Sequence, residues 1–227
     1  MEDMETKMNL NEWIAAGQPL NSYINCDNME LMKLIPDNYI DISIVDPPYG
    51  IERFKKGSLR FDKSEKAKNG LKWDEKPDEE YFLELFRISK YCIIWGANNF
   101  ILPTTEYFLI WNKKQTVDNF ASAEYAWTNC HIPAKVFDYS IHKCMSDRKS
   151  DGGKIHPIQK PIALYRWILQ NYAKPNDIIF DSHVGSASSL IACHEEGFKY
   201  IACELDEDYY RDSCKRLETH LSQLKLF

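Results

Sequence analysis

A carboxylate, two prolines and an aromatic ring stand together where the first strongly apolar run of the chain ends. The run covers residues 40–45 and is followed by Asp46-Pro47-Pro48-Tyr49-Gly50. Two successive prolines cannot continue a central strand, so the chain turns and presents the acid and the ring at the sheet edge. Carbonyl groups beside the prolines lack ladder partners. This set of groups suits a planar base with an exocyclic amine: the ring stacks on the base and the oxygens hold the amino group.

A second chemically mixed segment lies far downstream. A predicted strand at 177–180 runs into Asp181-Ser182-His183-Val184-Gly185-Ser186-Ala187, a turn of mostly small residues before a predicted helix at 188–196. A further strand at 199–203 then ends at Glu204. Small residues allow a ligand to approach the backbone, and an acid at the second strand end can bind ribose hydroxyls. The segment therefore predicts half of a nucleoside-binding unit. A glycine-rich dinucleotide fingerprint is missing, which disfavours a nucleotide-dependent oxidoreductase.

A third segment, His156-Pro157-Ile158-Gln159-Lys160-Pro161, precedes a predicted helix at 162–172. It is a turn that delivers Gln159 and Lys160 near a helix start. The lysine either pairs with a carboxylate or is solvated, and the segment taken alone does not decide between these alternatives.

Alternating strands and helices must position these segments. Asp27 is a predicted N-cap of a short amphipathic helix, since an acid there can accept from the first free backbone N–H groups. Alternation of this kind is typical of an α/β fold, here a doubly wound, mostly parallel sheet. Further strands are expected at 91–95, 107–111 and 122–128, and further helices at 78–89 and 207–221. No linker composition divides the chain, so we expect a single domain over 1–227 with long loops at 51–76 and 135–155.

Composition excludes several classes of protein. The chain has 227 residues, 44% hydrophobic and 27% charged, which is ordinary for a globular domain and unlike disordered, collagen-like or disulfide-scaffold chains. No signal peptide or membrane span is expected. Seven cysteines without close pairing indicate reduced thiols and a cytoplasmic location. His142 and Cys144 are two possible ligands in a loop, which is too few for a zinc site, and no metal is expected.

The three segments in this order resemble the beta class of DNA amino-methyltransferases, which use S-adenosylmethionine. That family carries DPPY first, HPTQKP next and DPFxGSGT near the C-terminus. Here the segments read DPPYG, HPIQKP and DSHVGSASS, and the resemblance extends from about Asp27 to about Tyr210. It implies a Rossmann-like methyltransferase sheet with a circularly permuted motif order, the catalytic motif first and the cofactor motif last. The length of the chain and the sequences of its motifs are similar to those of the compact phage or prophage members of the family.

The resemblance also implies roles for individual residues. Asp46, Pro47, Pro48 and Tyr49 would hold and stack the target base. The cofactor would be bound by a larger set, with Glu204 at the ribose, Asp27 near the adenine, and Lys160 and the turn near the methionine end. The full cofactor set is Asp27, Lys160, Asp181, Ser182, His183, Gly185, Ser186 and Glu204.

The sequence departs from the family pattern in the cofactor turn. Ser182 and His183 replace Pro-Phe, and Ala187 replaces the second glycine of GSG. We expect Ala187 to have a negative φ, because the residues after it lead directly into a helix. A nucleophilic pair of Ser182 and His183 is not expected, because neighbouring residues rarely face each other and a catalytic triad is assembled from distant segments.

Charge is distributed unevenly along the chain, although the net charge is −6 and the pI is about 5.6. Residues 52–76 hold nine basic and five acidic side chains, and residues 135–160 hold six and three. Residues 177–218 hold four and ten. A polyanion would therefore meet the two long loops, which makes DNA the expected partner. A compact family member without a large separate recognition domain is expected to form a homodimer that surrounds the DNA.

The function expected from the resemblance is methyl transfer to the exocyclic amine of a base that is flipped out of DNA. Adenine N6 is the favoured target, and cytosine N4 is the alternative. DPPY is more similar to adenine enzymes, since cytosine-N4 enzymes often carry SPPY. A protein that binds cofactor and DNA without catalysis is the alternative from a different class. A bacterial or phage origin and a restriction-modification role accompany the resemblance.

Overall fold

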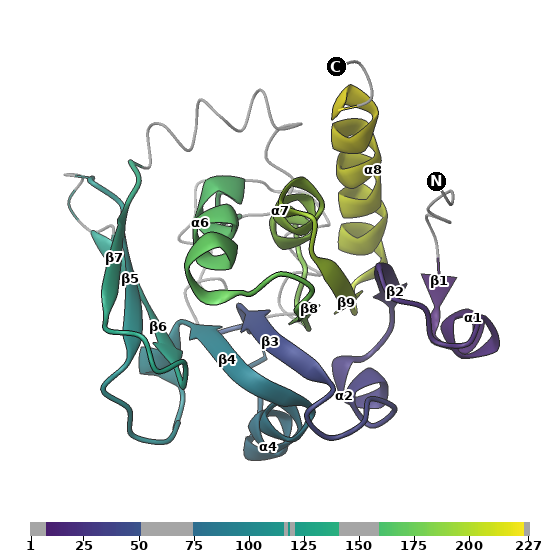
Figure 1. Ribbon diagram of the computed structural model, residues 1–227, viewed down its shortest axis with the longest axis horizontal. Coiled ribbons are helices and arrows are strands. Elements are labelled where there is room, and N and C mark those ends of the chain that lie inside the picture. Colours follow the sequence, from purple (N-terminus) through teal and green to yellow (C-terminus); the bar gives the residue numbers. More distant parts are fainter. Residues whose placement is uncertain (1–7, 51–74, 116–117, 119–120, 141–158, 225–227) are drawn as a thin grey trace.

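A computed structural model describes residues 8–50, 75–115, 118, 121–140 and 159–224. These residues form a nine-stranded sheet in the order β1-β2-β9-β8-β3-β4-β6-β5-β7, with helices on both faces (Figure 1). The strands are β1 Met8–Asn9, β2 Ser22–Asn25, β3 Ile40–Val45, β4 Ser89–Trp95, β5 Phe108–Asn112, β6 Ala123–Thr128, β7 Lys135–Asp138, β8 Ile178–Asp181 and β9 Lys199–Glu204. The helices are α1 Leu10–Ala15, α2 Asn28–Met32, α4 Glu79–Ile88, α6 Ile162–Tyr172, α7 Ser188–Glu196 and α8 Glu207–Leu224, with a 3-10 turn at Ala97–Asn99.

The sheet is mostly parallel, which confirms the predicted α/β architecture. Among the described strands, β6 runs antiparallel to both of its neighbours, β4 and β5, and the other pairings are parallel. In the centre, Ser43 of β3 pairs with Cys92 of β4 on one side and with Phe180 of β8 on the other. The central strands are buried on both faces, as expected for parallel strands covered by helices.

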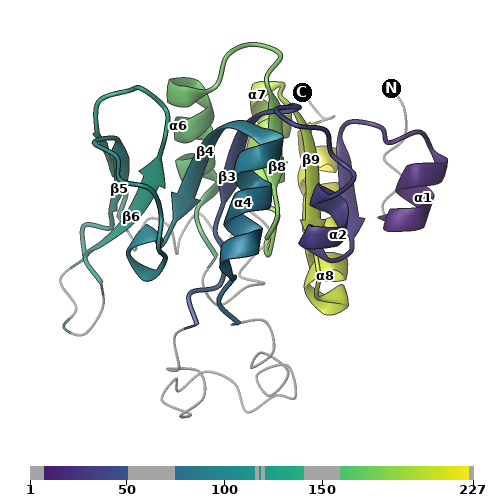
Figure 2. The same ribbon diagram turned by 90° about the horizontal axis from the view of Figure 1, so that it is seen from below.

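The chain winds in opposite directions from the centre of the sheet. The unit β3-α4-β4 places α4 on the face that α2 also covers, and the unit β8-α7-β9 places α7 on the other face beside α6 and α8 (Figures 1 and 2). Each face has its own core of buried residues, for example Leu31 and Leu85 on the first and Leu190 and Leu217 on the second. Because the winding reverses between β3 and β8, the carboxyl ends of these two strands are the expected place for a ligand.

Local sequence signals explain the ends of α4 and α7. The Asp78 carboxylate accepts from the Tyr81 backbone N–H at 3.0 Å and caps α4, whose apolar side chains recur at helical spacing. Helix α7 ends at Gly197, which has a φ of 75°. Glycine adopts this left-handed conformation at little cost, so the predicted C′ glycine is confirmed.

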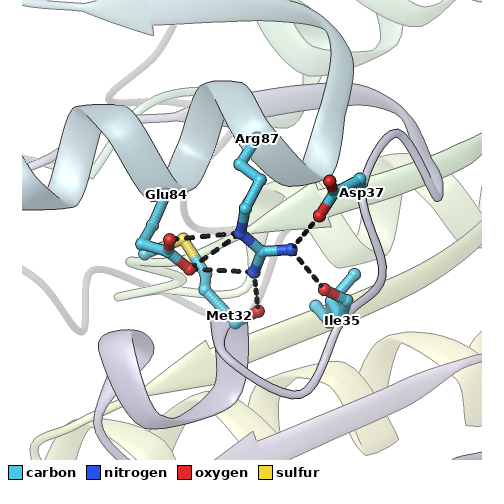
Figure 3. Close-up of polar contacts among 5 residues, drawn as sticks. All are labelled: Met32, Ile35, Asp37, Glu84 and Arg87. Carbon is cyan, nitrogen blue, oxygen red and sulfur yellow. Dashed lines mark hydrogen bonds and ion pairs between the residues drawn. The ribbon is translucent and has the colours of Figure 1, made fainter.

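An arginine on α4 fastens the segment that leads into β3 (Figure 3). Arg87 donates to the carbonyl oxygens of Met32 and Ile35 at 2.8 and 2.9 Å. It also pairs with Asp37 at 2.7 Å and with Glu84 at 2.8 Å. The guanidinium thereby satisfies carbonyls at the end of α2 and holds the connection that begins β3 against α4.

Two parts of the fold differ from the sequence-based expectation. The N-terminal elements β1, α1 and β2 were not predicted, and they add two strands to the edge beside β9. The expected loop at 135–155 was wrong at its start, because Lys135–Asp138 forms β7 and pairs in parallel with β5. Within the described residues, no helix is both long and apolar enough to span a membrane.

Candidate active site

A cleft of about 540 Å³ lies at the carboxyl ends of β2, β3, β8 and β9, where the winding of the sheet reverses. This volume is typical of small-molecule sites. Eight of the predicted site residues line it: Asp46, Pro48, Lys160, Ser182, His183, Gly185, Ser186 and Glu204. The fold therefore brings all three sequence segments to one cleft. Of the other four predicted residues, Pro47 is buried beside the cleft, and the positions of Asp27, Tyr49 and Asp181 are described below.

Both carboxylate oxygens of Asp46 are bonded to other side chains. The Tyr49 hydroxyl donates to Oδ1 at 2.5 Å, and Oδ2 forms an ion pair with Lys160 Nζ. Lys160 Nζ also lies 3.3 Å from the Tyr49 hydroxyl. Of the two alternatives left open by the sequence, the lysine therefore pairs with a carboxylate. Its side chain is 3% exposed, and burial lowers its pKa, but the Asp46 and Glu124 carboxylates outweigh burial and raise the pKa overall.

The Tyr49 ring lies against the backbone of Gly96, directly after β4. A methyl group added at Gly96 would meet the ring at 2.0 Å, and Gly96 has a φ of 67°, so only glycine fits this position. The Phe100 ring packs edge-on at a centroid distance of 6.1 Å. Burial first, and then the Asp46 carboxylate, raises the pKa of Tyr49, so the hydroxyl remains a donor.

Glu204 holds the turn on the other side of the cleft. Its Oε2 accepts from the Gly185 backbone N–H at 2.9 Å, and its Oε1 accepts from the Asp206 backbone N–H at 3.1 Å. Burial raises the pKa of this carboxyl, and the N–H donors partly offset the effect. Leu205, directly after it, lines the cleft and is 66% exposed. The strand end therefore offers an acceptor and an adjoining apolar side chain.

Asp181 lies under the turn and is 3% exposed. Its carboxylate accepts from the His183 backbone N–H at 3.0 Å and from the Ser189 hydroxyl at 2.5 Å. Burial raises its pKa to about 7, despite both hydrogen bonds. Asp181 therefore connects β8, the turn and the start of α7.

The side chains of Ser182 and His183 do face each other, and our contrary expectation was wrong. Ser182 Oγ lies 2.8 Å from His183 Nδ1, while the Tyr81 hydroxyl lies 2.7 Å from the same Oγ. His183 Nε2 is 3.1 Å from the Asn28 amide. The described hydrogen bonds of the imidazole therefore include no carboxylate of the kind that orients the histidine of a triad. Burial lowers the pKa of His183 to about 4, so the ring is neutral near pH 7.

Ala187 has a φ of 60°, so the expected negative φ was wrong. The residue is the N-cap of α7, where a left-handed conformation ends the turn before the helical φ values begin. Its carbonyl still accepts from Ile191 N–H at 3.0 Å, so α7 begins normally. A side chain in this conformation costs about 1–2 kcal/mol relative to the right-handed region. The family glycine at this position therefore corresponds to a real backbone requirement.

Two charged residues that contact the site were missed by sequence analysis. Arg216 of α8 is buried, and its Nη1 donates to the Ser186 carbonyl at 2.5 Å and to Ser188 Oγ at 3.0 Å. Glu124 of β6 forms an ion pair with Lys160 at 3.2 Å. Each appears in the sequence as an ordinary charged residue in an amphipathic element. No local signal distinguishes it, because its partners come from distant segments.

Asp27 lies next to the cleft in sequence, and several other predicted residues lie outside the part of the chain that the structure describes. The Asp27 carboxylate accepts from the Met29 and Glu30 backbone N–H groups at 2.8 and 3.2 Å, which confirms the predicted N-cap. Its neighbours Cys26 and Asn28 line the cleft. The two basic segments are residues 52–76 and 135–160, and most of their residues lie outside the described part of the chain. His142, Cys144 and the first three residues of HPIQKP also lie outside it.

Comparison with known proteins extends this description. A family model described as DNA methylase, of the N6/N4 type, matches residues 86–215, more than half of the chain. The chain belongs to the N6/N4 DNA methylase family. The matched range of this methylase includes Lys160, Asp181 and Glu204 and begins after Asp46 and Tyr49.

Curated relatives match this methylase over most of its length. The Type II methyltransferase M.HinfI of Haemophilus influenzae is 27% identical, over 93% of this chain and 70% of the relative. The protein YubD of Escherichia coli (strain K12) is 26% identical, over 87% of this chain and 90% of the relative.

Solved structures share the fold of the methylase. The M1.HpyAVI–SAM complex superposes with a TM-score of 0.55 at 18% identity, over 86% of this chain and 98% of that chain. The cytosine-N4-specific PvuII DNA methyltransferase superposes with a TM-score of 0.58 at 14% identity, over 96% and 92%. At these identities the likeness establishes the Rossmann-like fold alone.

Proposed function

We propose that this methylase transfers a methyl group from S-adenosylmethionine to the exocyclic amine of a DNA base, most specifically adenine N6. One observation carries the proposal: the Asp46 carboxylate at the end of β3 and the Gly185 turn after β8 line the same cleft on neighbouring strands. A base held at Asp46 and a cofactor held at the turn would then meet between the two strand ends. Direct transfer requires this proximity.

The cleft suits S-adenosylmethionine in its shape and its polar groups. The left-handed φ of 56° at Gly185 and the small Ser186 let a ligand approach the turn closely. The Glu204 carboxylate lines the cleft and would accept from ribose hydroxyls, and the exposed Leu205 beside it suits the flat face of an adenine. When bound, the cofactor supplies a methyl group already activated on a sulfonium.

The residues at the end of β3 would prepare the amine. The lone pair of an amino group on a base is delocalised into the ring, which makes the nitrogen a poor nucleophile. Asp46 would accept one of its hydrogens and take up the released proton, while the carbonyl of Pro47 would accept the other. Because Lys160 and Tyr49 already hold both oxygens of Asp46, the carboxylate is oriented before a base arrives. A base stacked on Tyr49 would have been flipped out of the duplex.

The finer assignments rest on the motifs. DPPY at Asp46 to Tyr49 favours adenine, and cytosine N4 is the alternative within the same chemistry. The order DPPYG, HPIQKP, DSHVGSASS favours the beta class, a single domain and a compact phage-like member with a restriction-modification role. We also propose a cytoplasmic location, contact between the two basic segments and DNA, and a homodimer on the DNA. The strain at Ala187 supports a second candidate, a protein that binds cofactor and DNA without turnover.

Transfer of a radiolabelled methyl group to DNA tests the proposal. The native chain should label mixed-sequence DNA, and Asp46→Asn should lower the rate by about 100-fold or more, because general acid–base groups contribute on that scale. Cofactor affinity should change less than about threefold in Asp46→Asn, since the substituted group lies at the base end of the cleft. Asp41→Asn is a matched control. Asp41 also pairs with a lysine, Lys90 at 2.6 Å, but lies at the amino end of β3. Near-native turnover of Asp46→Asn would contradict the role of Asp46.

A further inference from the structure

A row of four charged side chains extends from the cleft toward the antiparallel part of the sheet. Lys113, directly after β5, pairs with Glu124 Oε1 at 2.5 Å. Glu124 Oε2 lies 3.2 Å from Lys160 Nζ, and Lys160 pairs with Asp46. The charges alternate, so two lysines balance two carboxylates. The row connects β6 with the carboxylate at the end of β3.

Lys160 is buried and Glu124 is half-buried, which makes the balance of their charges important. The Lys160 side chain is 3% exposed and Glu124 is 24% exposed. Burial raises the pKa of Glu124, but Lys160 and Lys113 outweigh it and lower the pKa overall, so the group is ionised. A buried ammonium with one carboxylate removed would be pulled entirely toward the other, because unpaired charge is costly in the interior.

The position of Lys160 is determined by its three oxygen neighbours. Asp46 Oδ2, Glu124 Oε2 and the Tyr49 hydroxyl all lie within 3.3 Å of Nζ. An ammonium has three hydrogens to donate. Glu124 supplies a neighbour that does not line the cleft, and removing its charge would let Nζ shift toward Asp46 and Tyr49.

We propose that Glu124 is a positioning residue, which sets the direction of the Asp46 carboxylate by holding Lys160 between the two acids. This inference rests on the proposed methyl transfer, in which the direction of Asp46 toward the amine determines the rate. Glu124 itself does not line the cleft. Its effect should therefore appear in the chemical step and not in the binding of cofactor or DNA.

A double-mutant cycle tests this role. Glu124→Gln preserves the shape and removes the charge, and it should slow single-turnover methyl transfer by about tenfold, with dissociation constants for S-adenosylmethionine and DNA changed less than about twofold. In a Lys160→Met background the same substitution should change the rate by less than about twofold, because the residue through which Glu124 acts is gone. Asp138→Asn is the control. It breaks the exposed ion pair between Lys114 and Asp138, whose charged atoms are 3.0 Å apart. This substitution should leave the rate unchanged.

Each outcome of the cycle has a defined meaning. A native chain that transfers no methyl group refutes the proposed function. With an active native chain, equal rate losses from Glu124→Gln in both backgrounds, or no loss in the native background, refute the positioning role. If Glu124→Gln does not fold, Glu124→Asp keeps the charge on a shorter side chain. It should also slow transfer in the native background alone, and a loss of similar size beside Lys160→Met would overturn the inference.

Discussion

Lys160 forms an ion pair with Asp46, so a residue delivered by the segment before α6 holds the acid that follows β3. The Tyr49 hydroxyl holds the other oxygen of the same carboxylate at 2.5 Å. The two segments that carry these residues are far apart in the sequence and meet at one side chain. The Asp46 carboxylate is therefore oriented by the protein before any substrate is bound, and the orientation is not generated during the reaction.

Substitutions of Tyr49 should separate the ring from its hydroxyl. Tyr49→Ala removes the stacking surface, which is worth about 1–3 kcal/mol per base, and should lower turnover by about tenfold or more. Tyr49→Phe keeps the ring on Gly96 and loses only the hydroxyl, with its hydrogen bonds to Asp46 and from Lys160, so we expect a loss of about threefold. Steady-state rates on one DNA substrate make the comparison. Equal losses in the two variants would show that the hydroxyl, not the ring, matters.

Glu204→Gln should raise the dissociation constant for S-adenosylmethionine by about tenfold, as expected when a charge-assisted acceptor is lost. The carboxylate accepts from the Gly185 and Asp206 N–H groups, and an amide would turn its own NH₂ toward one of them. Glu207→Gln is the control, because Glu207 is exposed in the first turn of α8. Calorimetric titration of both variants measures the effect. Unchanged affinity in Glu204→Gln would place the ribose elsewhere.

Ala187→Gly should stabilise the fold by about 1 kcal/mol, because glycine adopts the φ of 60° without strain. Ala192→Gly, inside the same helix, should instead destabilise it by about 1 kcal/mol. Urea unfolding measures both. Cofactor affinity should change by less than about threefold in Ala187→Gly, since the turn has this conformation before ligand binds. A large gain in affinity would mean that the native turn impairs binding, and the non-catalytic alternative would then be preferred.

The buried His183 should make stability depend on pH. Its pKa is lowered to about 4 in the fold, whereas an unfolded histidine titrates near 6.5. Between these values the unfolded chain binds more protons, so the contribution of His183 to stability falls as pH falls through this window, by up to about 1.4 kcal/mol per pH unit. His183→Phe removes this titration, while Asp181 is present in both proteins. The difference between their unfolding free energies should therefore change between pH 6.5 and 4, and parallel curves would contradict the burial of a neutral ring.

The best-predicted parts of the fold have strong local signals. The bounds of β3 agree with the predicted strand because an apolar run is stopped by two prolines. The acid at the end of β9 and the glycine after α7 were placed for similar local reasons. Such features depend on a few adjacent residues, so the sequence alone is sufficient to find them.

The parts that were missed depend on contacts between distant segments. Strand β7 is short and lies at the sheet edge, and its pairing with β5 determines its conformation more than its composition does. Glu124 and Arg216 become recognisable only when Lys160 and the Ser186 carbonyl are placed beside them. The φ of Ala187 was mispredicted because helical φ values begin at Ser188, one residue later than expected. The turn imposes a left-handed residue immediately before α7.

Mass analysis of nucleosides tests the central claim most directly. Duplex DNA of mixed sequence would be incubated with the purified native chain and S-adenosylmethionine, digested to nucleosides and separated. The proposed function predicts N6-methyldeoxyadenosine that is absent without cofactor and absent with Asp46→Asn. N4-methyldeoxycytidine would select the alternative base with the same chemistry. DNA that yields no methylated nucleoside, or one methylated only on carbon, would contradict methyl transfer to an exocyclic amine by this chain.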